Sequence, residues 1–309
     1  MAPTRRLAVV YNPTKVEDLE ADRRVVAEAC RRHGWEEPSW IETTAEQTGE
    51  KQGRDAVEAG ADVVASLGGD GTVRAVASAL VGTGVPLGLL PAGTGNLLAR
   101  NLDLPVDSTA TAIEPLLTGS DRPIDVGFVS ADGKPEEVFL IMTGLGFDGE
   151  IMAGTSERVK GVIGWPAYVM SGLRQLLNRG FSARVEASGS DGVAGSPSDQ
   201  VRRHARTVIV GNCGTLQGGL ELMPDATVDD GVLDAVVIAP RGAVGWASVI
   251  ADIATRHRVG HQRLARLRGR EFTIGTGRPI EAEIDGDPIG PHQRLDIRVD
   301  PQSLLVRHG

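Results

Sequence analysis

The most constraining feature of this sequence is the glycine-rich segment 68–72 (GGDGT), which stands between a strand-like run at 61–67 and a helix-like run at 73–80. Its three glycines let the backbone turn tightly and approach a ligand without an intervening Cβ. We expect the helix to begin after Thr72 and to present its N–H groups and positive dipole end to a phosphate. Asp70 would repel a phosphate unless it also handles a Mg²⁺ ion or a substrate hydroxyl. The segment therefore favours phosphoryl transfer.

The N-terminal part of the chain alternates strand-like and helix-like runs. The predicted strands cover 7–11, 39–41, 61–67 and 86–90, and the predicted helices cover 19–32, 47–59 and 73–80. This alternation predicts a parallel sheet covered by helices, and so a three-layer α/β nucleotide-binding domain at 1–124. Its ligand loops should lie at the carboxyl ends of the strands.

The rest of the chain has mainly strand patterns separated by turn residues. The predicted strands cover 137–143, 183–187, 206–210, 233–238, 271–274, 280–284 and 295–299. They predict an antiparallel β-sandwich domain at 125–299, with one long helix at 161–177. The Ser-, Gly-, Asp- and Pro-rich segment 188–200 predicts a flexible hairpin tip. The sequence leaves open whether 300–309 packs back on the first domain.

Two further loops end predicted strands of the first domain. Segment 93–96 follows the strand at 86–90, one strand–helix unit after the first glycine loop, and segment 12–14 follows the first strand. One glycine loop alone is equally compatible with a plain strand-to-helix turn. Two in successive units, each with a threonine hydroxyl, favour a shared phosphate site at one sheet edge.

Segment 144–149 matches the G-x-G-x-x-G pattern of dinucleotide-binding loops. It lies after the strand–helix series, and no acidic strand end follows about 20 residues later, where such proteins bind ribose. We therefore do not expect a dinucleotide site there.

Two acidic segments have both a structural and a functional interpretation. Asp225, Asp229, Asp230 and Asp234 surround a glycine and could bind Mg²⁺ or Ca²⁺, although a solvated turn before a strand is the favoured interpretation. Segment 285–287 (DGD) closes a strand and reads on its own as a β-hairpin turn.

Composition limits the partners and the location. A net charge of −9 argues against a nucleic-acid partner, which needs a basic surface. One basic segment, 256–270, could meet anionic headgroups or ATP phosphates, and is equally compatible with a solvated face. Cys30 and Cys213 have no metal-ligand spacing and fit a reducing compartment. No run approaches the roughly 20 apolar residues of a membrane span, so we expect a cytoplasmic protein or one peripheral at the inner membrane face.

Together these segments resemble the diacylglycerol kinase catalytic family, which includes sphingosine kinases and bacterial lipid kinases. The resemblance covers nearly the whole chain and rests on 12–14, 68–72, 93–96, Asp125 after Pro123 and Ile124, 144–148, 224–233 and 285–287. It implies a nucleotide-binding α/β domain followed by a β-sandwich, with the active site in the cleft between them. It also implies an ATP- and Mg²⁺-dependent kinase acting on a lipid hydroxyl, diacylglycerol-like or sphingoid-like, in phospholipid metabolism.

The resemblance also implies roles for individual residues. Asp285 matches the general base that takes the lipid hydroxyl proton, and Asp70 and Asp287 complete the catalytic candidates. Asp70 and Asp125 match acids around the catalytic Mg²⁺, and a second, structural Mg²⁺ site matches Thr227, Asp230 and Val232. The candidate nucleotide-binding residues are Asn12, Pro13, Thr14, Thr43, Gly68, Gly69, Asp70, Gly71, Thr72, Gly93, Thr94, Gly95 and Asn96.

Two positions depart from the family pattern, and several alternatives stay open. Leu97 stands where several bacterial relatives have Asp, and Asp287 stands where many have Glu. An NAD kinase shares a GGDGT loop, although segments 224–233 and 285–287 favour the lipid family. A lipid- or nucleotide-binding regulator without catalysis is a further alternative. The sequence identifies neither the acceptor lipid nor the oligomeric state, a homodimer being one option.

Overall fold

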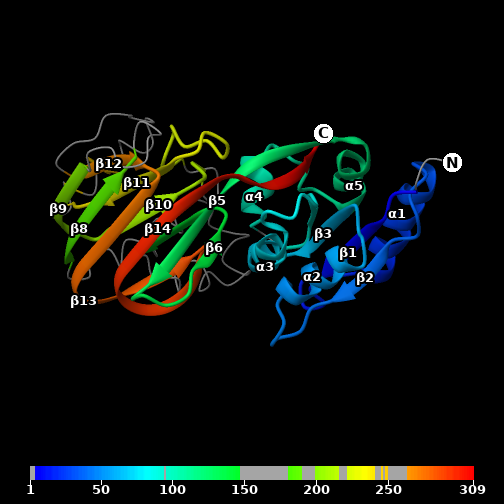
Figure 1. Cartoon of the computed structure of the whole chain (residues 1–309), viewed down its shortest axis with the longest axis horizontal. Helices are drawn as coiled ribbons and strands as arrows, with labels where there is room; N and C mark the ends of the chain where they lie inside the picture. Colours follow the sequence, from blue (N-terminus) through cyan, green and yellow to red (C-terminus); the bar gives the residue numbers. More distant parts are fainter. Residues whose placement is uncertain are drawn as a thin grey trace. The chain divides into compact units, whose positions relative to one another are not determined.

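The computed structural model describes residues 4–93, 95–146, 180–189, 199–215, 221–240, 245, 248–249 and 263–309. The chain forms two compact units. The α/β unit comprises residues 1–126 and 301–309, and the β-rich unit comprises 127–300 (Figure 1). Within the described residues, no helix is long and apolar enough to cross a membrane.

The α/β unit is built on a parallel sheet with strand order β4-β3-β1-β2. The strands are β1 (Leu7–Tyr11), β2 (Ser39–Glu42), β3 (Val63–Gly68) and β4 (Leu87–Pro91). In the register, Val9 lies opposite Trp40 of β2 and Ala65 of β3. Val306, near the end of β14 (Asp287–His308), pairs in parallel with Leu87 and extends the sheet beyond β4.

Helices cover both faces of this sheet, which confirms the predicted three-layer architecture. They are α1 (Leu19–Arg32), α2 (Glu50–Glu58), α3 (Asp70–Leu80), α4 (Leu97–Asn101) and α5 (Thr109–Thr118). Alternate residues of β1 and β3, such as Val9 and Ala65, pack against Val26 of α1 and Leu116 of α5. Helices α2 and α3 pack against each other on the remaining face (Figure 1).

Two helix starts differ from the sequence predictions, each because of a glycine. Helix α3 begins at Asp70 and not after Thr72, since the extended Gly69 is the N-cap residue and its carbonyl accepts hydrogen bonds from Thr72 and Val73. Helix α2 begins at Glu50 because Gly49, with a φ of 142°, interrupts the helical backbone. Helices α4 and α5 were not expected.

The β-rich unit is an antiparallel β-sandwich, as the sequence predicts. Its strands are β5 (Ser120–Ala131, which begins in the α/β unit), β6 (Glu137–Phe139), β7 (Met142–Leu145), β8 (Phe181–Ser188), β9 (Asp199–Ala205), β10 (Thr207–Gly211), β11 (Leu233–Ile238), β12 (Leu264–Gly269), β13 (Glu271–Ile284) and the first part of β14. One layer has the order β12-β11-β10-β7-β13, and β9-β8-β13-β14 forms the other.

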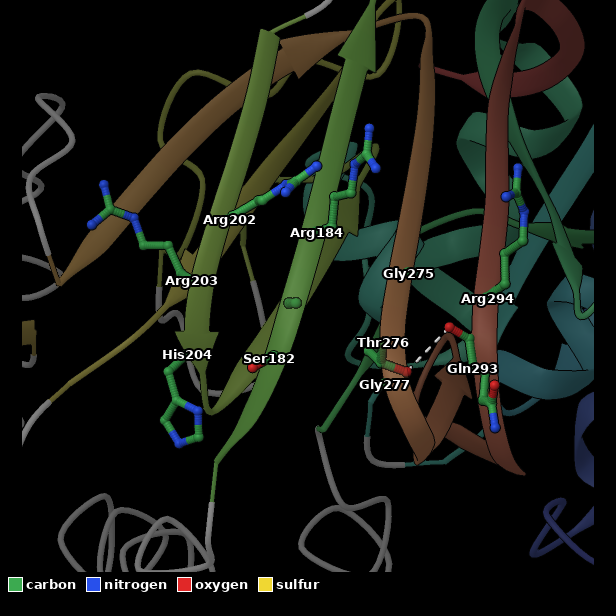
Figure 2. A pocket seen from close by; sticks show the side chains of 11 residues that line it. Ser182, Arg184, Arg202, Arg203, His204, Gly275, Thr276, Gly277, Gln293 and Arg294 are labelled. Carbon is green, nitrogen blue, oxygen red and sulfur yellow. Dashed lines mark hydrogen bonds between the residues drawn. The ribbon is translucent and has the colours of Figure 1, made fainter.

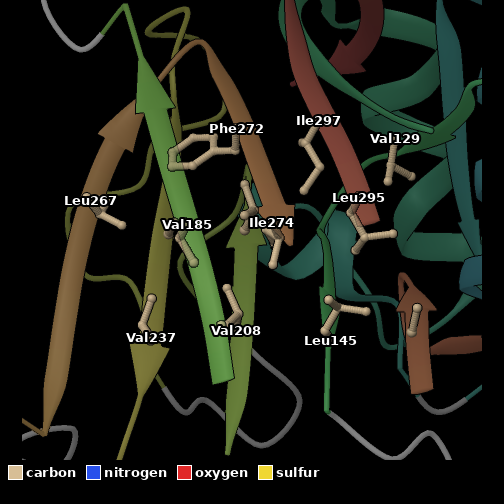
Figure 3. Close-up of a cluster of buried hydrophobic side chains, with 14 of the residues drawn as sticks. Val129, Leu145, Val185, Val208, Val237, Leu267, Phe272, Ile274, Leu295 and Ile297 are labelled. Carbon is tan, nitrogen blue, oxygen red and sulfur yellow. The ribbon is translucent and has the colours of Figure 1, made fainter. Parts of the chain in front are cut away.

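Strand β13 joins both layers because it bends midway. Residues 271–276 pair with β8, residues 282–284 pair with β7, and the pairing with β14 is irregular between Gly275 and Ile280. Buried residues such as Val185, Val208 and Ile274 form the core of the sandwich (Figure 3).

Several strand predictions in this unit need correction. The run 137–143 is not one strand but two, β6 and β7, with Leu140 and Ile141 between them. The runs 271–274 and 280–284 belong to the single strand β13. Strands β9 and β12 were missed because their many arginines hide the apolar alternation. The predicted helix 161–177 and most of the predicted hairpin tip lie outside the described residues.

Candidate active site

The carboxyl ends of four parallel strands lie next to one another in the α/β unit. Thr43, directly after β2, donates its backbone N–H to Tyr11 at 2.9 Å, and Asn12, after β1, donates to Leu67 of β3 at 3.0 Å. The side chain of Asn12 accepts two hydrogen bonds from Thr14, from N at 3.0 Å and from Oγ1 at 2.8 Å. The candidate residues from β1, β2 and β3 therefore share one sheet edge, as expected of a parallel sheet.

Side-chain contacts join the three candidate loops. Asn12 Nδ2 lies 3.5 Å from Thr72 Oγ1. Asp70 Oδ1 accepts the backbone N–H of Leu97, the first residue of α4, at 2.7 Å. A Cβ added to Gly95 would lie 2.2 Å from Asp70 Oδ2. The sequence-predicted proximity of the loops after β3 and β4 is therefore present in the structure.

The glycines of these loops have different local functions. A Cβ on Gly68 would lie 2.6 Å from the Thr72 side chain, so this glycine allows the loop to fold onto its own helix. Gly93 has a φ of 121°, which favours glycine. A Cβ on Gly69, in contrast, would meet no atom within 4 Å. Gly69 therefore leaves open space above the backbone.

The remaining candidate nucleotide-binding residues have fewer contacts that fix their position. Pro13 is exposed, Gly71 lies in the first turn of α3, and Thr94 lies outside the described residues. Asn96 has left-handed backbone (φ 48°) and donates from Nδ2 to the carbonyl of Gly93 at 3.2 Å, which closes the second loop.

Asp125 is completely buried in β5. Its Oδ1 accepts the backbone N–H of Gln302 at 2.8 Å, so within the α/β unit it attaches the final segment of β14 to β5. This contact gives Asp125 a structural role. Its assignment to Mg²⁺ stays a prediction.

Asp285 lies in the β-rich unit, at the first position of the two-residue turn between β13 and β14. Asp285 and Gly286 have φ values of 50° and 86°, and Ile284 pairs with Asp287 across the turn. These features define the hairpin turn that the dipeptide predicts, with left-handed backbone at both positions.

The carboxylate of Asp285 is buried and held by backbone donors. Oδ2 accepts from the N–H of Leu140 at 3.0 Å, and Oδ1 accepts from Ile141 at 2.8 Å and Met142 at 3.0 Å. These donors turn the chain between β6 and β7, which explains why the predicted strand 137–143 is broken. These hydrogen bonds fix the orientation of the carboxylate.

Three residues near Asp285 were not predicted from the sequence. Glu283, completely buried, accepts the N–H of Gly286 through Oε2 at 2.6 Å. Cys213 is buried beside the carboxylate, and burial first, then the charge of Asp285, raises the pKa of its thiol. Asn212 lies 3.4 Å from the carbonyl of Leu140 through Nδ2. Of these three residues, only Glu283 could have been noticed in the sequence, because it lies two positions before Asp285. Asp287, in contrast, is exposed at the start of β14.

The predicted structural Mg²⁺ loop has other partners. The Asp230 carboxylate accepts from Thr227 Oγ1 at 2.6 Å and from the N–H of Val232 at 3.2 Å, and it pairs with Arg268. The guanidinium of Arg268 therefore neutralises Asp230 in this arrangement, and the assignment of Thr227, Asp230 and Val232 to a Mg²⁺ ion stays a prediction. No group of three or more His, Cys, Asp or Glu that could hold a metal occurs among the residues that the structure describes.

The neighbouring Asp234 has a perturbed carboxyl group. Burial raises its pKa to about 6, and the charges of Asp230 and Asp225 add to the effect, while Arg268 opposes it. Arg268 Nε lies 3.8 Å from Asp234 Oδ2. Arg268, in the described end of the basic segment 256–270, therefore interacts with the carboxylates of this acidic loop.

The G-x-G-x-x-G match begins inside an antiparallel strand. Gly144 lies in β7, opposite Ile209 and Glu283, and a Cβ there would come within 2.3 Å of the Val208 carbonyl oxygen. This glycine allows close packing within an antiparallel sheet. Positions 147–149 lie outside the described residues.

Comparison with known proteins gives the class that this fold and these loops define. The diacylglycerol kinase catalytic domain model matches residues 6–129, and the model described as the YegS C-terminal NAD kinase beta sandwich-like domain matches 143–308. A solved structure described as a diacylglycerol kinase from Bacillus anthracis strain Sterne shares the fold, with a TM-score of 0.73, 19% identity and coverage of 99% of this chain and 97% of that one.

Relatives in sequence support the same class. A protein named "Probable lipid kinase YegS-like" from Pseudomonas syringae pv. syringae (strain B728a) is 33% identical over 310 residues, covering 98% of this chain and 93% of that protein. A protein of the same name from Pseudomonas aeruginosa (strain UCBPP-PA14) is 33% identical over 256 residues, covering 82% and 78%. This chain belongs to the YegS-like lipid kinase family, which carries the diacylglycerol kinase catalytic domain.

Proposed function

We propose that this protein is an ATP-dependent lipid kinase that transfers the γ-phosphoryl group to a lipid hydroxyl. The observation that carries the proposal is the joining of three strand-end loops in the α/β unit through Asn12–Thr72 and Asp70–Leu97. Family membership supplies the reaction class and the lipid acceptor. Loops of this kind bind nucleotide phosphates in other α/β proteins.

The α/β unit binds the ATP phosphates through backbone groups. Gly69 offers backbone with open space above it, and Gly71 lies in the first turn of α3, where the helix dipole is positive. Asn12 and Thr72 add an amide and a hydroxyl next to this turn. Fixed donors of this kind stabilise the charge that develops on the transferred group.

Asp70 is the residue of the α/β unit that fits a Mg²⁺ ion. Oδ1 is oriented by the N–H of Leu97, and Oδ2 lies where a side chain at position 95 would be, so glycine there keeps the carboxylate accessible. When bound, Mg²⁺ would neutralise charge on the phosphate oxygens.

The β-rich unit supplies the general base, Asp285. Three backbone N–H groups hold its carboxylate in one orientation, and burial excludes water from its surroundings. In the proposed reaction it accepts the proton of the lipid hydroxyl as that oxygen attacks the γ-phosphorus. We assign the exposed Asp287, in the same segment 285–287, a role in supporting Asp285.

The experiment that tests this function is incubation with radiolabelled ATP, Mg²⁺ and a total lipid extract, followed by identification of the labelled product. We expect label in a lipid, and diacylglycerol, sphingoid bases, phosphatidylglycerol and isoprenoid alcohols are the acceptors to compare. A parallel reaction with NAD in place of the lipid should give no labelled product, which would exclude an NAD kinase. Absence of label from every acceptor would contradict the proposal and favour a non-catalytic regulator.

The Asp285→Asn variant tests the base. It should abolish transfer while ATP affinity, measured by calorimetry, stays within about twofold, because no step of nucleotide binding is assigned to Asp285. Asp55→Asn, an exposed change on α2, is the matched control and should keep full activity. Unchanged turnover in Asp285→Asn would remove this residue from the mechanism.

A further inference from the structure

Three arginines and one glycine form a row across the outer face of the β9-β8-β13-β14 layer. Arg202 of β9 lies opposite Arg184 of β8, Arg184 lies opposite Gly275 of β13, and Gly275 lies opposite Arg294 of β14. The three arginine side chains are exposed, while their strand neighbours such as Val185 belong to the sandwich core. Figure 2 shows Arg184 and Arg294 on either side of β13 and Arg202 extending toward β8.

A hollow of about 760 Å³ opens along this row. Gly275 supplies part of its floor, because a Cβ at this position would meet no atom within 4 Å. Ser182, Thr276 and Gln293 add polar groups to the lining, and Thr276 Oγ1 donates to the carbonyl of Gln293 at 3.1 Å. The hollow is an open groove on the face of the sheet and not an enclosed cavity.

The charges in the row are not arranged for stability. Arg202 and Arg184 are directly opposite on neighbouring strands, where like charges destabilise a sheet. Arg184 pairs with Glu186 along its strand, and Arg294 pairs with Asp296 at 2.6 and 2.7 Å. The side chain of Arg202 forms no hydrogen bond or ion pair with any residue that the structure describes. In a chain of net charge −9, an exposed arginine without a side-chain partner among the described residues, placed opposite a second arginine, points to an anionic ligand.

The guanidinium groups define the chemistry of the ligand. Arginine presents a planar set of donors that matches the oxygens of a phosphate, and Arg202 together with Arg184, next to the open Gly275, can bind one phosphoryl group. We propose that this hollow binds the phosphate monoester of a small ligand or of a lipid headgroup. The site lies within the β-rich unit and does not depend on the proposed kinase activity.

Two probes distinguish the sources of the phosphoryl group. Calorimetry with glycerol 3-phosphate tests a soluble ligand, and sedimentation with phosphatidylcholine vesicles containing phosphatidic acid tests a headgroup, with pure phosphatidylcholine vesicles as the reference. Arg202→Gln should weaken binding about tenfold, as expected for one charged hydrogen-bonding partner. Gly275→Val should abolish binding, since its side chain would occupy the open space above this strand position between Arg184 and Arg294, and should still fold, since valine favours strands.

Arg54→Gln, an exposed arginine on α2, removes the same charge elsewhere and should bind both probes like the wild type. Binding of either probe that Gly275→Val abolishes supports the site and identifies its source. Two results would overturn it. One is failure of the wild type to bind either probe, and the other is wild-type affinity in both Arg202→Gln and Gly275→Val.

Discussion

The carboxylate of Asp70 accepts the backbone N–H of Leu97 at 2.7 Å, so a residue of the first glycine loop caps the short helix that follows the second. This contact links two helix starts, Asp70 of α3 and Leu97 of α4, that are 27 residues apart in the chain. It shows that Asp70 stabilises the loop pair independently of any ligand. Its structural and chemical roles can therefore be separated by substitution.

We expect Asp70→Asn and Asp70→Ala to differ in stability but not in activity. Asparagine retains an oxygen that can accept from Leu97, whereas alanine leaves this N–H without its cap and should lower the free energy of unfolding by about 1 kcal/mol. Both variants remove the charge and should lose most phosphoryl transfer. Urea unfolding and the labelled-ATP assay measure the two effects. An active Asp70→Asn variant would limit Asp70 to its structural role.

Alanine substitutions at Gly69 and Gly95 allow the two glycine loops to be compared. A Cβ on Gly69 meets no protein atom within 4 Å, so Gly69→Ala should leave Tm within a few degrees while lowering ATP affinity about tenfold, because the methyl group would face the phosphates. A Cβ on Gly95 would displace Asp70, so Gly95→Ala should lower both Tm and ATP affinity. Calorimetry and thermal unfolding measure these changes. Unchanged ATP affinity in Gly69→Ala would move the phosphates away from the first loop.

Much of the α/β unit could be predicted because its information is local. The apolar runs of β1 and β3, with Asn12 and Pro13 after the first and glycines after the second, define both the strands and the sheet edge at which Asn12 and Asp70 lie. Parallel pairing then brings the loops together without further information. The predicted start of α3 was wrong by one turn because Gly69 is the N-cap residue. Glycine does not indicate an N-cap in a sequence as serine or aspartate does.

The surroundings of Asp285 could not be predicted because they depend on long-range contacts. Its partners are backbone N–H groups of Leu140, Ile141 and Met142, about 140 residues earlier in the chain. Backbone donors leave no mark in the sequence. The row of Arg184, Arg202 and Arg294 escaped for a similar reason, since it arises only from strand register.

The two cysteines should be unreactive in the folded protein. Burial raises the pKa of Cys30 to about 11 and, together with Asp285, raises that of Cys213 further, so neither is a thiolate at pH 8. We expect no reaction with a chromogenic disulfide reagent in native buffer and two equivalents in denaturant. Rapid reaction of one native thiol would show that its surroundings open readily.

Asp234 should make stability depend on pH in an unusual direction. Its pKa is raised to about 6 in the folded protein, above the ordinary value of 3.8, so the folded state retains a proton between these values that the unfolded chain has released. Stability from this group therefore falls as pH rises from about 4 to 6, and the penalty is complete above pH 6. Asp234→Asn removes it and should raise the free energy of unfolding by about 1–3 kcal/mol at pH 7 and by little near pH 4. Urea unfolding across this range measures the difference, with the exposed Asp107→Asn as control. An equal change at both pH values would show that the pKa of Asp234 is not raised in the folded protein, because Arg268 then offsets the effect of burial.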